Sequence, residues 1–464
     1  MSDPLAALAQ IAGGAWLVGG AVRDRLLGRR TADFDVAVPG GAGELARQLG
    51  AAAGAFAFEL SREFGAWRVV AHDRSWQLDL IPLGGATIED DLSRRDLTIN
   101  AIAAPISGGD YIDPFGGRAD LERRQLRMVA PDAFRRDPLR TLRLARLACE
   151  LGFAVDPATA GAARASAPAL AQVAPERIFV ELARVVCADD ALGGLALMDA
   201  AGVTEAILPE LGALRGVEQN RFHHLDVLDH TRAVLAETIA LERDPGLVCA
   251  GDEIAGEVRR WLAQPLANEL TRGQALRFGA LLHDIAKPRT RAVTPEGRVT
   301  FIGHDDFGAE LSAAILGRLR TAERLGEHVA ALTRHHLRLG FLVHQMPLSR
   351  RAVYGYLHAC DPVQVDVTLL SVADRLATRG DNAEPAIARH LELARELLPE
   401  ALAWAADPPR PPLRGDELAR ALGIRPGPVV GRLLAELQAA SFSGELATPE
   451  EAIERARRLI VDHG

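Results

Sequence analysis

Two aspartates separated by a single residue are the feature of this sequence best suited to chemistry. Asp33 and Asp35 lie in an apolar run downstream of the glycine pair Gly19 and Gly20. Because side chains alternate along a strand, both carboxylates project from one face. Two carboxylates on a rigid face suit Mg²⁺, which accepts one or two protein carboxylates together with substrate phosphates. A solvated edge strand is the commoner explanation of a lone aspartate pair. Glycines that admit a phosphate to the backbone, with Arg23 one helical turn further on, favour a nucleotide site instead.

Two arginine-rich segments strengthen this interpretation. Residues 93–103 read SRRDLTINAIA, with polar side chains placed within two helical turns. Residues 134–148 read FRRDPLRTLRLARLA, in which Pro138 suits the first turn of a helix. A solvated helix surface would show the same arginine spacing. The polar residues are Arg94, Arg95, Asp96 and Asn100 in the first segment, and Asp137, Arg140, Arg143 and Arg146, close to one helix face, in the second.

In order and spacing, these motifs resemble the class II tRNA nucleotidyltransferase and bacterial poly(A) polymerase family, over residues 14 to about 215. The resemblance implies nucleotide transfer from CTP and ATP to an RNA 3′-hydroxyl, with metal ions assisting the attack and the departure of pyrophosphate. It implies that Asp33 and Asp35 are catalytic and bind Mg²⁺, and that Asp137 and Arg140 read the base. The nucleotide contacts that it implies are Gly19, Gly20, Arg23, Arg95, Asp96, Asn100, Asp137, Arg140 and Arg143.

A third carboxylate is a candidate for the same catalytic face. Alternation over the expected strand Trp76–Pro82 directs Asp79 to the same side as Gln77 and Ile81. A strand-edge aspartate without a catalytic role is the commoner case. We include Asp79 among the catalytic candidates.

An arginine-rich stretch sets the expected RNA contact. The chain has a net charge of −9, yet residues 118–146 hold nine arginines against four acidic residues. A basic strip within an acidic protein is typical of an RNA site. The family that the motifs resemble has an acidic residue before the base-reading aspartate, whereas this chain has Arg136 there. We expect Arg135, Arg136 and Arg146 to contact RNA, with a tRNA 3′ end as the partner.

A separate constellation lies further along the chain. The dyad His283-Asp284, with the remote His230 and Asp374, resembles the ligand set of HD-domain metal phosphohydrolases. Imidazole and carboxylate groups from separate helices suit a divalent transition metal that activates water against a phosphoester. A histidine on an apolar helix is more often a satisfied core residue, and an HD fold can persist as an inactive spacer. The further histidines that would complete a second metal site are His304 and either His335 or His336.

Composition and length limit the class of protein. Of 464 residues, 48% are hydrophobic and 25% are charged, which is typical of globular proteins. No apolar run approaches the roughly 20 residues that span a membrane. The N-terminus lacks the basic start of a signal peptide, and the four cysteines show no CxxC pairing. We therefore expect a cytoplasmic protein with no membrane contact and no obligate protein partner.

These observations predict an α+β protein of four parts. A nucleotidyltransferase palm, a small mixed sheet with helices, would occupy residues 1–130. A helical neck that reads the base and binds RNA would follow over residues 131–215, and an HD metal-dependent phosphohydrolase domain over residues 216–405. Residues 406–464 are similar to the C-terminal helical segment of HD-containing nucleotidyltransferases, which implies a tRNA-binding module.

The predicted function is template-independent addition of C, C and A to the 3′ end of tRNA, joined to an HD phosphohydrolase that trims cyclic or terminal phosphates. A poly(A) polymerase, or an enzyme that adds only CC or only A, would share the same head motifs. A metal phosphohydrolase with a vestigial head and a pure RNA-binding regulator are alternatives of other classes. The intact Asp33, Asp35, Asp137 and Arg140 disfavour both of these.

Overall fold

The computed structural model describes residues 3–463. The chain separates into two compact units, Met1–Ile207 and Leu208–Gly464. A mixed β-sheet lies in the first unit, whereas the second is helical apart from short two-stranded ribbons. The predicted α+β class is confirmed. The finer division into four parts stays a prediction.

A six-stranded sheet forms the centre of the first unit. Neighbouring strands are antiparallel except β2 and β5, which run parallel. The parallel pair places Asp33 beside Gln77 and Asp35 beside Asp79. In spatial order the strands are β3 (Ala55–Ser61), β4 (Ala66–Ala71), β5 (Gln77–Pro82), β2 (Asp33–Val38), β1 (Trp16–Val18) and β6 (Ala103–Pro105).

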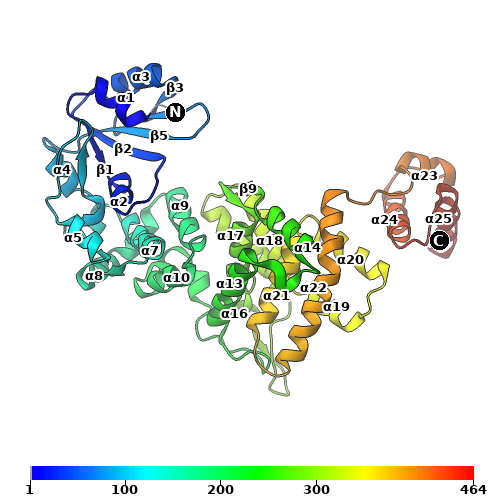
Figure 1. Cartoon of the computed structure of the whole chain (residues 1–464). Helices are drawn as coiled ribbons and strands as arrows, with labels where there is room; N and C mark the ends of the chain where they lie inside the picture. The colour runs from blue at the N-terminus through cyan, green and yellow to red at the C-terminus, as the bar shows by residue number, and fades with distance from the viewer. Residues whose placement is uncertain (1–2, 464) are drawn as a thin grey trace. The chain divides into compact units, whose positions relative to one another are not determined.

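One face of this sheet is buried. Val36 and Leu80 are shielded from solvent and share a core with Leu8 of α1 (Pro4–Ile11) and Leu49 of α3 (Ala42–Ala53). Figure 1 shows these two helices side by side next to the sheet. Because side chains alternate along β2, its two aspartates project from the opposite face. The buried core therefore fixes the direction in which the carboxylates point.

Short helices and turns beyond the sheet carry the arginine motifs. The helix predicted after Pro138 is α7 (Leu139–Leu151). At Gly117 a Cβ atom would lie 2.1 Å from the carbonyl oxygen of Thr98, so glycine is required where α5 meets the turn before Asn100. The remaining elements of this unit are α2 (Gly20–Leu26), α4 (Ile88–Ser93), η1 (Thr98–Asn100), α5 (Gly117–Glu122), β7 (Gln125–Leu126), α6 (Ala133–Arg136), β8 (Ala154–Val155), α8 (Pro157–Ser166), η2 (Ala167–Gln172), α9 (Pro175–Val186), α10 (Ala191–Ala200) and α11 (Val203–Ile207).

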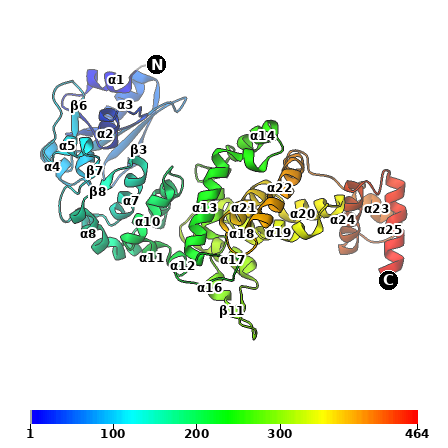
Figure 2. The ribbon, with the colours of Figure 1, turned by 60° about the horizontal axis from the view of Figure 1, so that its bottom comes forward.

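Helices make up most of the second unit, and Figure 2 shows α13, α18 and α21 packed beside one another. No helix within residues 3–463 is long and apolar enough to cross a membrane. The elements are α12 (Pro209–Gly212), α13 (Val227–Arg243), η3 (Pro245–Val248), α14 (Asp252–Leu262), β9 (Pro265–Ala267), β10 (Leu270–Thr271), α15 (Arg272–Leu282), α16 (Lys287–Thr290), β11 (Ala292–Val293), β12 (Val299–Thr300), α17 (His304–Arg318), α18 (Glu323–His335), α19 (Arg338–Leu342), η4 (Val343–Gln345), α20 (Arg350–Cys360), α21 (Gln364–Ala377), α22 (Ala383–Ala406), α23 (Gly415–Leu422), α24 (Pro428–Phe442) and α25 (Pro449–His463).

The last three helices have a small core of their own. Leu418, Leu437 and Ala456, one from each helix, are buried together. The start of α25 is fixed by a capping box, in which the Glu451 N–H donates to Thr448 Oγ1 at 3.2 Å and the Glu451 carboxylate accepts from the Thr448 N–H at 3.3 Å. This packing explains how residues beyond α22 fold, and it does not by itself indicate what they bind.

Candidate functional site

Two aspartates of β2 line a cavity of about 880 Å³ in the first unit. Asp33 is exposed, and its Oδ1 accepts a hydrogen bond from Gln77 Nε2 at 3.0 Å. Asp35 is partly buried and lies opposite Asp79 in the strand register. The predicted placement of both β2 carboxylates on one face is therefore what the sheet produces.

Asp79, the third catalytic candidate, already has a strong partner. Arg68 of β4 donates to both its oxygens, from Nε to Oδ1 at 2.6 Å and from a terminal nitrogen to Oδ2 at 2.7 Å. Paired bonds of this kind are among the strongest between side chains. Asp79 thus anchors Arg68 in this structure, and its catalytic role stays a prediction.

Burial has a direct electrostatic consequence for Asp35. It raises the pKa of that carboxyl to about 6, and the neighbouring negative charges of Asp33 and Asp79 add to the rise, against the opposing influence of Arg95 and Arg68. Like charges at one site disfavour ionisation. A cation bound between Asp33 and Asp35 would relieve this repulsion, so the pair is suited to hold a divalent metal.

The glycine turn before α2 lines the cavity next to the carboxylates. Gly19 has a φ of +71°, and a Cβ atom there would lie 2.9 Å from a terminal nitrogen of Arg95 and 3.4 Å from Asp35 Oδ2. Glycine therefore keeps the approach to the carboxylates open. Gly20 and Arg23 also line the cavity. Buried Arg23 is held by Asp24 and donates to Asn100 Oδ1 at 2.9 Å.

The segment after α4 supplies a buried polar network. Asn100 Nδ2 donates to Asp96 Oδ1 at 3.0 Å, and Arg143 lies 3.4 Å from the other oxygen of Asp96. Burial alone would raise the pKa of Asp96, but the charge of Arg143 and these hydrogen bonds hold it below its usual value. Arg95 is paired with Asp91 at 3.0 Å. Among the cavity arginines within residues 3–463, exposed Arg94 has no ion-pair partner.

The arginines of α7 are engaged with the protein itself. Arg140 donates to the carbonyl oxygens of Arg94 at 2.7 Å and Arg95 at 3.2 Å. Arg143 and Arg146 both pair with Glu181 of α9, at 3.0 and 2.5 Å. Arg146, predicted to contact RNA, is buried in this network and not part of an exposed basic surface. The sequence analysis missed Glu181, whose signal was an acidic residue on the apolar face of its helix.

The base-reading and RNA candidates lie at the edge of this network. Asp137 accepts from Arg177 at 2.9 Å, a contact that the sequence did not reveal. Arg135 and Arg136 are exposed, and Arg136 pairs with Asp132 at 2.8 Å. The exposed pair is therefore accessible to a large ligand, whereas Asp137 is held by α9.

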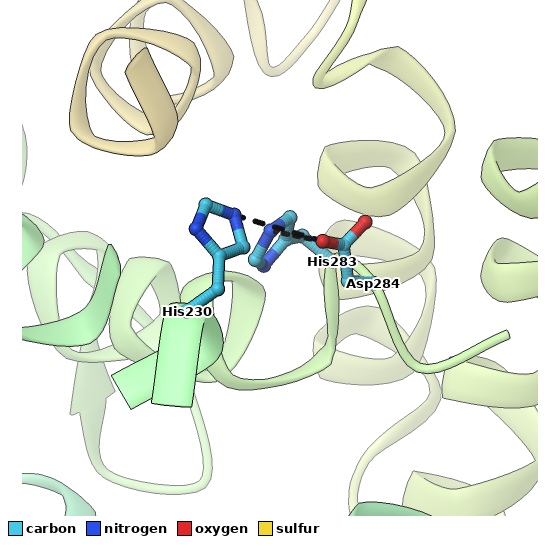
Figure 3. A group of neighbouring side chains, drawn as sticks. All are labelled: His230, His283 and Asp284. Carbon is cyan, nitrogen blue, oxygen red and sulfur yellow. Dashed lines mark ion pairs between the residues drawn. The ribbon is translucent and has the colours of Figure 1, made fainter. Parts of the chain in front are cut away.

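A second cluster lies in the other unit. His230 of α13 and His283 at the end of α15 converge on Asp284, as Figure 3 shows. Their Nε2 atoms lie 3.7 and 3.1 Å from Asp284 Oδ2. These three atoms are buried and make no hydrogen bond of acceptable geometry among the described residues. Buried polar atoms rarely lack a hydrogen-bond partner, and a divalent metal could be bound by all three atoms.

Asp284 faces a second pair of histidines through its other oxygen. His304 and His336 place Nε2 at 3.3 and 3.9 Å from Asp284 Oδ1. Of the two histidines predicted as alternatives for this group, His335 lies outside the cluster, and its ring accepts a hydrogen bond from Arg338 Nε at 2.8 Å. Its neighbour His336, the alternative, occupies the position. Asp284 thus has a histidine pair on each side.

Backbone carbonyls orient three of these imidazoles. Nδ1 lies within 2.8 Å of the carbonyl oxygen three residues earlier in His283, His304 and His336. In a neutral ring, the nitrogen that faces a carbonyl carries the proton, and Nε2 directs a lone pair at the cluster. Burial opposes the charged form of His283, but neighbouring Asp284 outweighs it and raises the pKa of that ring above its usual value. Burial lowers the pKa of His336 to about 4, which keeps it neutral. Neutral imidazoles are the form that binds metals.

Asp374 and Lys287 border the cluster. Asp374 Oδ1 lies 3.0 Å from His230 Nε2, and Lys287 Nζ lies 2.6 Å from Asp284 Oδ2. The sequence analysis did not select Lys287. The cluster opens onto a cavity of about 800 Å³ that is also lined by Arg375, Arg389 and His390. Cationic side chains around a candidate metal site suit an anionic, phosphate-bearing ligand.

Family models match three parts of the chain. Residues 15–127 match the poly A polymerase head domain, residues 152–214 match a probable RNA and SrmB-binding site of polymerase A, and residues 227–379 match the HD domain. An A-adding tRNA nucleotidyltransferase of Deinococcus radiodurans is 39% identical, over 95% of this chain and 94% of the relative. The chain belongs to the tRNA nucleotidyltransferase and poly(A) polymerase family. The resemblance stated from the sequence is confirmed.

The names of other relatives refer to the addition of different nucleotides. A CC-adding tRNA nucleotidyltransferase of Thermus thermophilus is 36% identical, over 94% of this chain and 92% of the relative. A multifunctional CCA protein of Xanthomonas campestris is 33% identical, over 88% of this chain and 96% of the relative. Solved structures share the fold. A CCA-adding enzyme in apo form I has a TM-score of 0.65 at 19% identity, covering 98% of this chain and 94% of that one.

Removing the charge of Asp35 should stabilise the metal-free protein. Because the folded pKa is raised to about 6, ionisation costs stability as the pH rises through that value. We expect Asp35→Asn, in a chelator at pH 8, to gain about 2 kcal/mol of unfolding free energy, measured by denaturant titration. The gain should shrink as the pH falls below 6 and vanish below 3.8, the usual pKa of aspartate, where Asp35 is protonated in both the folded and the unfolded chain. The exposed Asp33→Asn is the control, and equal stability of Asp35→Asn and wild type at pH 8 would contradict the electrostatic assignment.

The adjacent histidines 335 and 336 offer a matched test of the second cluster. His336→Ala should lower the metal content of protein saturated with Mn²⁺ or Ni²⁺, measured by mass spectrometry after gel filtration, because it removes one ligand of the Asp284 Oδ1 group. His335→Ala should leave the content unchanged. Asp284→Ala should remove metal from both groups. Equal losses in the two histidine variants would show that His336 is not a ligand.

Proposed function

We propose that this protein adds nucleotides to the 3′ end of tRNA and builds the CCA terminus from CTP and ATP. The observation that carries the proposal is the pair Asp33 and Asp35, which the sheet holds on one face at the cavity. Gly19 lies beside them, and a Cβ atom at that position would restrict the space next to Asp35. Named relatives that add A, CC or CCA to tRNA support it. A tRNA-directed reaction also favours a cytoplasmic location.

Asp33 and Asp35 would hold Mg²⁺ together with the triphosphate. When bound, Mg²⁺ assists deprotonation of the RNA 3′-hydroxyl and stabilises the charge that develops on pyrophosphate. Positioning is the main task of the protein in such a reaction. Gln77 orients Asp33, and the Arg68–Asp79 pair keeps the neighbouring strand face rigid.

The triphosphate would lie against the arginine side of the cavity. Arg94 is exposed and free of ion pairs within residues 3–463, so it can contact a phosphate without breaking an internal contact. Arg95 would bind after exchanging Asp91 for a phosphate oxygen. The Asp96–Asn100 network offers hydrogen bonds to a ribose. These contacts discriminate a nucleotide from other anions by shape and not by charge alone.

Recognition of C and A is assigned to Asp137 and Arg140. An aspartate accepts and an arginine donates hydrogen bonds, as reading of a base edge requires. Arg140 is held in place by the backbone of Arg94 and Arg95, which connects the base-reading group to the expected triphosphate site. Arg177 must release Asp137 before that carboxylate reads a base.

The specificity is tested by offering tRNA that ends before CCA, after C or after CC. With labelled CTP and ATP together we expect complete CCA, with CTP alone two additions, and with ATP alone a single addition to the CC-ending tRNA. Asp33→Ala and Asp35→Ala should lower incorporation by several orders of magnitude because the metal ligands are lost. As controls, these variants should bind tRNA within about twofold of wild type.

Three results would replace the CCA assignment. Addition to CC-ending tRNA only would make the protein an A-adding enzyme, the activity in the name of the 39% identical relative. Addition of C residues only would make it a CC-adding enzyme. Long tails of A would indicate a poly(A) polymerase. No incorporation by wild-type protein on any substrate would contradict the transferase proposal itself.

A second activity, phosphoester hydrolysis, is favoured by the two histidine groups around Asp284. These residues would hold divalent transition metals, which supply an activated water when bound. Lys287 and Arg375 in the same cavity would orient the phosphate. The metal fit rests on the orphaned Nε2 atoms of His230 and His283.

Metal-dependent hydrolysis is tested with p-nitrophenyl phosphate and its diester analogue, in the presence of Mn²⁺, Ni²⁺ or Mg²⁺. Asp284→Ala should abolish hydrolysis, because both histidine pairs lose their shared ligand, while nucleotide addition stays within about twofold of wild type. Absence of hydrolysis with every metal would mean that this HD domain is inactive toward simple phosphoesters. Loss of both activities with an unchanged melting curve would mean that the two sites are coupled.

A further inference from the structure

An exposed apolar strip runs along the edge of the catalytic sheet. Phe56, Phe58 and Leu60 alternate along β3 and are 58%, 47% and 44% exposed, and Phe64 in the turn after β3 is 68% exposed. We call these four residues the β3 strip. Large apolar side chains exposed contiguously on one strand mark an interaction surface more often than scattered ones do.

The strand register places Phe56 and Phe58 of the β3 strip on the same face as Asp33 and Asp35, whereas Leu60 lies where the register shifts between Glu59 and Ser61. Phe58 lies opposite Arg68, Arg68 opposite Asp79, and Asp79 beside Asp35. Residues directly opposite in a sheet share a face. Three steps between strands separate Phe58 from Asp35, which corresponds to about 14 Å. The strip and the carboxylates thus form one continuous surface.

The parallel row confirms this alignment. Phe56 lies opposite Val70, Val70 opposite Gln77, and Gln77 beside Asp33. The opposite side of β3 faces α3 instead, where Gly50 meets Ala57. Side chains of β3 are therefore exposed on the face that carries Asp33 and Asp35, whereas α3 covers the other face.

Phe64 connects the strip to the cavity. It lines the same cavity as Asp33 and Asp35, although it lies beyond the end of β3. An aromatic ring so exposed gains nothing from the protein core. Its position beside the carboxylates leaves it available to a ligand that extends out of the cavity.

We propose that the β3 strip stacks unpaired bases of the RNA acceptor end and so guides its 3′-hydroxyl toward Asp33 and Asp35. The proposal rests on the transferase function. Alternate side chains on a strand are spaced by about 6.8 Å, which lets successive bases meet successive side chains. The strip offers rings and no free cation among these neighbours, since Arg68 is held by Asp79 and the exposed Arg62 pairs with Glu59 at 3.3 Å. A continuous path from the strip to the carboxylates is what a strand of RNA requires, and a protein partner would cover the cavity.

The experiment measures binding of fluorescein-labelled tRNA ending after the first C, in which the discriminator base and that C are both unpaired, to the full-length protein. Phe58→Ala and Phe64→Ala should each weaken binding about tenfold. The slope of affinity against salt concentration should not change, because no phosphate contact is lost. In steady-state assays the KM for tRNA should rise while the KM for CTP stays constant. Phe58→Trp should restore wild-type affinity, and Val293→Ala, which truncates an exposed side chain on β11 of the second unit, is the control.

Three results would overturn the proposal. Wild-type affinity of Phe58→Leu would show that an aromatic ring is not needed. A change in salt slope equal to that of an arginine variant would assign the effect to charge. Unchanged tRNA binding with a loss of dimer in sedimentation would make the strip a contact between two copies of the chain. Because tRNA binding is read without catalysis, failure of wild-type transfer would contradict the proposed function and leave this test intact.

Discussion

Repulsion between neighbouring carboxylates is the constraint on which the first site depends. The parallel pairing of β2 and β5 places Asp35 beside Asp79, and the sheet holds them there whatever the electrostatic cost. Neighbouring arginines offset the repulsion at Asp79 more than at Asp35. Arg68 binds both oxygens of Asp79, whereas burial and the neighbouring carboxylates raise the pKa of Asp35 to about 6. The residual negative charge is thereby concentrated on Asp33 and Asp35, the two groups that face the cavity, and a cation is the ligand that this arrangement favours.

The second site also favours a cation, and most of its candidate ligands are histidines. One buried carboxylate, that of Asp284, is surrounded by imidazoles, and Nδ1 of three of them faces a backbone carbonyl, so that each of these rings in its neutral form directs a lone pair inward. Such a shell cannot neutralise Asp284 by itself. Lys287 does so at 2.6 Å from one oxygen, which is the role that a metal would take over. In both units a sheet or a set of helices holds acidic oxygens where protein groups alone leave them incompletely satisfied.

Local patterns carried most of the prediction from sequence. Alternation placed Asp33 and Asp35 on one face, and Pro138 indicated where α7 starts, because both depend on residues a few positions apart. Contacts between distant segments were missed. Nothing local to Asp79 reveals that β4 brings Arg68 opposite it, and nothing near Arg143 reveals Glu181. The choice between His335 and His336 depends on where α18 ends, since the residue that follows the last helical turn is the one that turns inward.

The arginines of α7 show why a charge pattern alone misleads about RNA binding. Regular spacing predicted a basic face, yet Arg143 and Arg146 share Glu181, and Arg140 binds backbone carbonyls. A guanidinium held by a carboxylate must lose that partner before it binds phosphate, so its net gain is small. Arg143 and Arg146 thus connect α7 to α9 beside the cavity. Affinity for RNA must then come from groups with no internal partner to lose, namely exposed cations such as Arg94 and exposed rings.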